Sequence, residues 1–127
     1  MDNASSNMSI AGLHHITVEV KNLEEAFEFY VEILGLDELD TPDNIKEAGV
    51  RWIKFNDGSA LHLIENVNCS PPVLAHMALR VDDLNSWEEY LDNKGVKIKA
   101  PKLNVYSAER FFIHDPSGNR IEIIKQL

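Results

Sequence analysis

The sequence predicts an α+β fold made of two βαβββ units in tandem, and three observations support this prediction. First, the stretch His15–Leu23 is repeated 61 residues later as His76–Leu84. Second, Gly58–Ile64 matches Gly118–Ile124 at an offset of 60 residues. Third, each repeat begins with a strand-like alternation that runs into a helical spacing of apolar residues. A repeat of about 60 residues therefore defines the architecture before any single element is assigned.

The first unit is predicted to consist of a strand, a helix and three further strands. Its first strand has an apolar face and a polar face, and the polar face carries His15. The helix has apolar residues at intervals of three and four, with Asn22 as its N-cap and Gly35 at its end. We expect a strand over 13–20, a helix over 23–34, a short strand over 36–41, a polar connection over 42–48, and hairpin strands over 50–55 and 60–65.

The second unit repeats this order after a linker at residues 67–72, where Pro71 and Pro72 stop any helix or strand. We expect a strand over 74–81, a helix over 84–93 capped by Asp83, a short strand over 96–99, and strands over 109–114 and 120–125. Because a unit of this size is marginal alone, both should share one core. The predicted organisation is a flexible tail over 1–10 and a single domain over 11–127, with units 11–66 and 73–127.

Composition excludes several classes of partner. The net charge of −9 argues against nucleic acid or an anionic membrane surface, since both require basic patches. No apolar run is long enough to span a bilayer, and the first ten residues lack the features of a signal peptide. Cys69 is the sole cysteine, so an internal disulfide is impossible and a reducing, cytoplasmic location is expected.

The repeat aligns four side chains that can bind metal ions. His15 corresponds to His76, and His62 corresponds to Glu122. A single histidine on a strand is more often a packed or surface residue than a ligand. Three imidazoles and one carboxylate at duplicated positions instead suit one divalent ion such as zinc, nickel, cobalt, manganese or iron(II).

Strand parity predicts which residues surround such an ion. Trp52 and Phe112 are equivalent in the repeat, and we expect them to form two aromatic walls, although both could be ordinary core residues. Arg80 or Arg110 could bind a substrate carboxylate or phosphate. His14 should face the helix and be structural. The predicted substrate pocket comprises Thr17, Glu19, Trp52, Arg80, Arg110 and Phe112.

The chain resembles the vicinal oxygen chelate superfamily, which includes glyoxalase I, methylmalonyl-CoA epimerase, fosfomycin-resistance thiol transferases, extradiol dioxygenases and bleomycin-binding proteins. The stretches that carry the resemblance are His15–Leu23, Phe29-Tyr30, Leu34-Gly35-Leu36 and the ending Asp115–Glu122. The resemblance implies a curved mixed sheet with helices on its convex face and a metal on its concave face. It also implies a homodimer.

The resemblance places His15, His62, His76 and Glu122 at the four ligand positions. Glyoxalase I usually has an acid where this chain has His62, and fosfomycin enzymes use only the positions of His15, His76 and Glu122. Glu122 would also be the catalytic base, as its counterpart is in glyoxalase I.

The function expected from this resemblance is metal-dependent lyase, isomerase or group-transfer chemistry on a small substrate that chelates the metal through two oxygens. Two alternatives remain open. The first is an iron(II) extradiol-type dioxygenase whose iron is bound by His15, His76 and Glu122. The second is a metal-free protein of the bleomycin-resistance kind that binds a drug or metabolite. The sequence also leaves open whether the ligands meet within one chain or between two.

Overall fold

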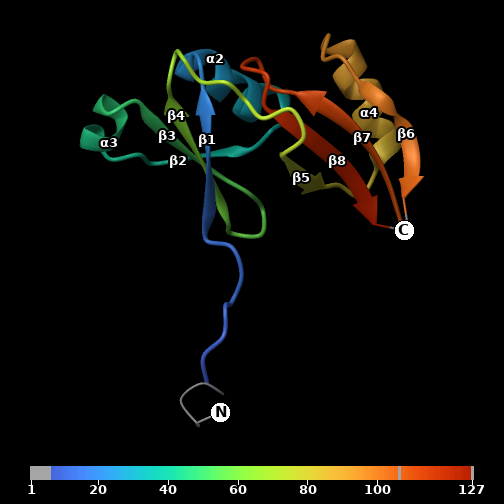
Figure 1. Ribbon diagram of the computed structural model, residues 1–127, viewed down its shortest axis with the longest axis horizontal. Coiled ribbons are helices and arrows are strands. Elements are labelled where there is room, and N and C mark those ends of the chain that lie inside the picture. The colour runs from blue at the N-terminus through green and yellow to red at the C-terminus, as the bar shows by residue number, and fades with distance from the viewer. Residues whose placement is uncertain (1–6, 106, 127) are drawn as a thin grey trace.

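A computed structural model describes residues 7–105 and 107–126, with side chains described outside residues 100–105. The chain forms two four-stranded sheets, each covered on one face by a helix (Figure 1). The first unit comprises β1 (His15–Val20), α2 (Leu23–Glu28), the π-helical turn η1 (Phe29–Ile33), β2 (Asp37–Leu39), α3 (Asp43–Glu47), β3 (Val50–Lys54) and β4 (Ala60–Glu65). The second comprises β5 (His76–Arg80), α4 (Leu84–Asn93), β6 (Lys99–Val105), β7 (Ala108–His114) and β8 (Arg120–Gln126).

The two sheets have the same topology. Their strand orders are β1-β4-β3-β2 and β5-β8-β7-β6. In each sheet the first pair is parallel and the others are antiparallel. This repetition confirms the mixed α+β class and the two βαβββ units. The expected curved sheet is divided, within one chain, into two sheets whose end strands β1 and β5 do not pair with each other.

The helices pack against the apolar faces of both sheets and create one shared core. Tyr30 from η1 and Leu91 from α4 are fully buried. They belong to a single cluster with strand residues from both units, including Ile53, Leu61 and Phe111. The polar faces of the sheets therefore remain on the side opposite the helices, which we call the helix-free face.

The turn between β7 and β8 fastens the second unit to the first. The Tyr30 hydroxyl donates a hydrogen bond to Asp115 Oδ2 at 2.8 Å. The Lys21 backbone N–H donates to Ser117 Oγ at 2.8 Å, and Asn119 Nδ2 donates to the Glu19 carbonyl at 2.8 Å. The Asp-Pro-Ser-Gly-Asn stretch that supported the family resemblance therefore joins the two units.

Three local expectations were wrong. The polar connection at residues 42–48 contains the short helix α3, with Asp43 in its first turn, where a carboxylate interacts favourably with the helix dipole. The first predicted helix ends in the π-turn η1, closed by Leu34 N–H donating to the Phe29 carbonyl at 2.9 Å. The strand predicted over 96–99 begins instead at Lys99, because Val96 and Ile98 pack against the core.

In the described ranges of the chain, no helix is long and apolar enough to cross a membrane.

Candidate metal centre

The strand register places the predicted site residues on the helix-free faces. On the first sheet, Thr17, His62 and Trp52 lie directly opposite one another across β1, β4 and β3. On the second sheet, Glu122 and Phe112 occupy the equivalent places on β8 and β7. Directly opposed residues share a face of a sheet, so the predicted strand parity is correct in both units.

His15 and His62 form the N-terminal pair. Their rings are stacked with centroids 4.0 Å apart, and Trp52 stacks on His62 at 4.9 Å. Burial, followed by the positive charges of His15 and His14, lowers the pKa of His62. This shift favours the neutral imidazole, which is the form that binds a metal. His14 does not face the helix as expected. It is exposed, and its Nδ1 lies 2.8 Å from His15 Nδ1.

His76 and Glu122 form the C-terminal pair. His76 Nδ1 lies 2.8 Å from the Leu74 carbonyl oxygen, so it carries the proton and donates it there. In the neutral ring Nε2 then presents a lone pair, and this atom lies 3.4 Å from Glu122 Oε1. Two ligand atoms that share one divalent ion are about 3.0–3.4 Å apart at ordinary bond lengths and angles. The donor types and their spacing therefore fit a metal ion.

Arg110 holds the other oxygen of this carboxylate. Its Nε lies 3.2 Å from Glu122 Oε2, and the Glu122 side chain is only 14% exposed. A partly buried carboxylate needs such a partner, because desolvation penalises its charge. Arg110 consequently fixes Glu122 so that Oε1 faces His76.

The two pairs are not brought together within one chain. Among the described residues, no group of three or more His, Cys, Asp or Glu side chains is placed to hold a metal ion. A cleft of about 1280 Å³ lies beside the end strands β1 and β5 instead. Figure 1 shows these two strands on separate sheets. A single chain thus contains two halves of the predicted ligand set.

The predicted substrate residues divide between this cleft and the sheet faces. Thr17, Glu19 and Arg80 line the cleft, although the Glu19 carboxylate already accepts a hydrogen bond from Asn66 Nδ2. Trp52 lies outside the cleft, beside His62.

Phe112 is not the open wall that was expected, because it is only 4% exposed. The guanidinium of Arg120 lies 3.7 Å from the centre of its ring, and that of Arg110 lies 4.7 Å away. Arg120 was missed by the sequence reasoning. The alternation of side chains along β8 would have placed Arg120 on the face of Glu122, since it lies two residues before Glu122 on the same strand.

Comparison with known proteins establishes the family. The sequence model of the Glyoxalase/Bleomycin resistance protein/Dioxygenase superfamily matches residues 12–123. This match covers most of the chain, and the strand topology of both units agrees with it. The protein belongs to this superfamily, which is the family that the His-led strands and the Asp115–Glu122 ending resembled.

Relatives of several activities are similar to this chain over most of its length. Glyoxylase I 4 of Arabidopsis thaliana is 23% identical, over 96% of this chain and 75% of the relative. Metallothiol transferase FosB of Staphylococcus haemolyticus is 26% identical, over 90% of this chain and 83% of the relative.

Two solved structures are similar in both fold and sequence. A putative glyoxalase family protein from Bacillus anthracis has a TM-score of 0.85 and 28% identity, covering 95% of this chain and 99% of that protein. TnmS3, an antibiotic binding protein from Streptomyces sp. CB03234, has a TM-score of 0.76 and 28% identity, covering 95% of this chain and all of that protein.

Proposed function

We propose that this protein is a divalent-metal-dependent enzyme of the glyoxalase type, with lyase, isomerase or group-transferase activity. Its substrate is a small molecule that chelates the metal through two oxygens. The observation that carries the proposal is the C-terminal pair, in which His76 is held in the tautomer that directs a free Nε2 toward Glu122. Relatives named as a glyoxylase and a metallothiol transferase support the same class.

His15, His62, His76 and Glu122 are the residues that would hold the ion. A bound divalent ion would act as a Lewis acid, stabilising negative charge on substrate oxygen. Glu122 is the sole carboxylate of this set, so it is the residue to transfer the substrate proton. Arg110 positions Glu122 through its Oε2, leaving Oε1 for the reacting side.

We propose further that the complete centre forms between two copies of the chain. Each copy has a free strand edge next to each pair, because β1 and β5 end their sheets among the described residues. Unpaired edges are templates for association. Apolar residues also lie exposed just before both strands, with Ile10 at 94% and Val73 at 84% exposure. A homodimer pairing β1 with the second copy's β5 would join each N-terminal pair to a C-terminal pair.

Elemental analysis of untagged protein, purified without chelator, tests the metal proposal. We expect about one divalent ion per chain in the unmodified protein, since four ligands define one centre. The His15→Ala variant should lose the ion while keeping its circular dichroism spectrum. Equal metal content in both proteins, or none after reconstitution with zinc, nickel, cobalt, manganese and iron(II), would reject the proposal.

A second candidate function is metal-free binding of a drug or metabolite. It is favoured by the similarity to TnmS3, an antibiotic binding protein. The two candidates differ in their response to chelation. A binding protein keeps its ligand affinity after dialysis against EDTA, whereas a metal centre of this type loses it.

A further inference from the structure

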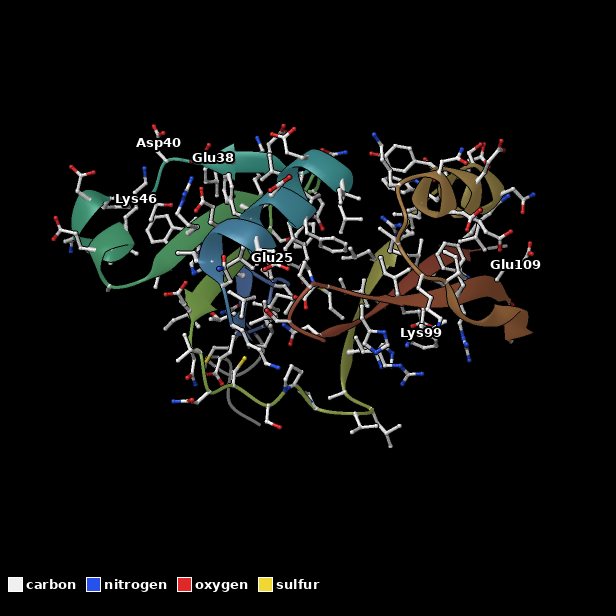
Figure 2. All side chains as sticks on the ribbon, turned by 90° about the horizontal axis from the view of Figure 1, so that it is seen from above. Glu25, Glu38, Asp40, Lys46, Lys99 and Glu109 are labelled. Carbon is white, nitrogen blue, oxygen red and sulfur yellow. The ribbon has the colours of Figure 1, made fainter. Side chains whose placement is uncertain are left out.

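The two helix-free faces differ in charge although they descend from one repeated unit. Three positions of the second sheet carry arginine where the first sheet has other residues. The pairs in the repeat are Glu19 and Arg80, Val50 and Arg110, and Ala60 and Arg120. Lys99 adds a fourth cation, because it lies opposite Phe112 across β6 and β7. Figure 2 shows Lys99 and Glu109 on different sides of this sheet, with Glu109 on the α4 side.

This concentration of positive charge stands out in a chain whose net charge is −9. Among the described residues of the second helix-free face, Glu122 is the only carboxylate, and Arg110 already pairs with it. Arg80 lies at the outer edge, on the end strand β5. The pKa of Asp57 is lowered mainly by hydrogen bonds from Ser59 and further by the positive charge of Arg80. No ion pair is found for Arg80, Arg120 or Lys99 on this face of the described structure, and of these three Arg120 and Lys99 lie next to Phe112.

Arg120 occupies a central place on this face. It lies directly opposite His76 on one side and His114 on the other. Its guanidinium carbon lies 3.7 Å from the centre of the Phe112 ring, and one nitrogen donates to the Leu74 carbonyl at 3.3 Å. A guanidinium held over a ring keeps its remaining N–H groups at its edge, where they can bind an oxyanion.

His114 lies directly opposite Arg120, and its surroundings show the same excess of positive charge. Its Nδ1 is buried and has no hydrogen-bond partner among the described residues. Burial lowers the pKa of His114, and the positive charges of Lys99 and Arg120 lower it further. The two cations therefore act on a common space next to His114, which also contains an unused polar atom.

We propose that Arg120 and Lys99 form an oxyanion subsite that binds a carboxylate or phosphate group of the substrate. The inference rests on the proposed function for its position relative to the metal, because His76 lies next to Arg120. The N-terminal side carries no arginine at the equivalent positions and has Trp52 stacked on His62, so it would then receive the apolar part of the same substrate. Charge asymmetry between the repeats thereby sets the direction in which the substrate binds.

Titration calorimetry with phenyl phosphate, phenylacetate and benzyl alcohol tests the subsite in the full chain as purified and after EDTA treatment. We expect at least one anion to bind and the neutral alcohol to bind weakly or not at all. The stronger of the two anions identifies phosphate or carboxylate as the natural group. Arg120→Gln should weaken anion binding by about tenfold or more, the usual effect of losing a hydrogen bond to a charged group.

Lys54→Gln is the matched control, because Lys54 is a cation on the helix-free face of the first sheet, opposite Ala60. It should change anion affinity by less than about twofold, since an exposed charge acts weakly at a distance. Arg120→Lys keeps the charge and should retain part of the binding, which guards against a folding defect in Arg120→Gln. Equal weakening by the Arg120→Gln and Lys54→Gln substitutions, or no binding of either anion, would overturn the subsite.

Metal content separates this inference from the proposed function. Arg120→Gln should contain as much metal as the unmodified protein, since Arg120 is not a proposed ligand. Arg120-dependent anion binding in a protein that takes up no metal would support the subsite and reject the proposed metal centre. Normal metal content without anion binding would reject the subsite alone.

Discussion

His76 and His114 lie on the helix-free face of the same sheet, yet hydrogen bonding prepares only His76 to bind a metal. His76 Nδ1 donates to the Leu74 carbonyl, so its Nε2 is free to act as a ligand. His114 has no such second-shell partner for its buried Nδ1 in the described structure. The orientation of a ligating histidine depends on this outer hydrogen bond.

His76→Ala should therefore abolish metal binding, and His114→Ala should leave the metal content within about twofold of that of the unmodified protein, since His114 is neither a proposed ligand nor a partner of one. Elemental analysis of the two purified variants measures the difference. Retention of metal by His76→Ala would show that the C-terminal pair is not part of a centre.

Tyr30 gives a residue-scale test of the joint between the units. Burial first, and then the neighbouring Asp115 carboxylate, raises the pKa of Tyr30 well above 10.0. The folded state therefore keeps the proton at a pH where the unfolded chain releases it. Stability from this group is complete below pH 10 and falls above it, by up to about 1.4 kcal/mol per pH unit.

Tyr30→Phe should cost about 1.5–3 kcal/mol at pH 7, the contribution of a hydrogen bond to a charged acceptor. The difference in unfolding free energy between the two proteins should shrink above pH 10, because the variant lacks this titration. Urea unfolding from pH 7 to 11 measures it. A difference that stays constant across this range would contradict the assignment.

At the scale of elements, the turn between β7 and β8 differs from the equivalent turn between β3 and β4. Asp115 is buried and accepts hydrogen bonds from Tyr30, Ser117 and Asn119. Asp57, in the equivalent turn of the first unit, is exposed and bonds only to Ser59 among the described residues. The β7–β8 turn therefore joins the two units, whereas the hydrogen bonds of Asp57 lie within the β3–β4 turn itself.

Asp115→Ala should destabilise the fold by about 3 kcal/mol or more, because it leaves several buried donors unsatisfied. Asp57→Ala serves as the control, and its effect should be clearly smaller because solvent replaces the lost partner. Chemical denaturation of both variants gives the comparison. Similar costs at the two positions would show that the β7–β8 turn does not hold the units together.

The sequence allowed some elements to be predicted and concealed others, for identifiable reasons. Alternation in β1 and β8 predicted the faces of His15 and Glu122 correctly, because side chains on a strand alternate strictly. The π-turn η1 could not be predicted, since its extra residue leaves the apolar spacing of Phe29–Leu34 nearly helical. The start of β6 was misplaced because apolar Val96 and Ile98 serve the core without joining the sheet.

At the scale of the whole molecule, the repeat aligned the candidate ligands but did not predict how far apart they lie. Duplication aligned His15 with His76 and His62 with Glu122, and His15 and His76 indeed lie on the end strands β1 and β5. The separation of the two pairs depends on how the units pack, through contacts such as Tyr30 to Asp115 that no local pattern encodes. In the described part of one chain, the four candidate ligands therefore lie as two separate pairs.

If the centre forms between two copies, one N-terminal pair and one C-terminal pair from different copies should complete each centre. This expectation is tested by mixing two variants that cannot bind metal alone, His15→Ala and Glu122→Gln. In a mixed dimer, one centre lacks both ligands and the other has all four. After joint unfolding and refolding of equal amounts, we expect about one metal ion per four chains, since about half the dimers are mixed. No metal in the mixture, with about one per chain in identically treated unmodified protein, would show that the centre does not form between two copies.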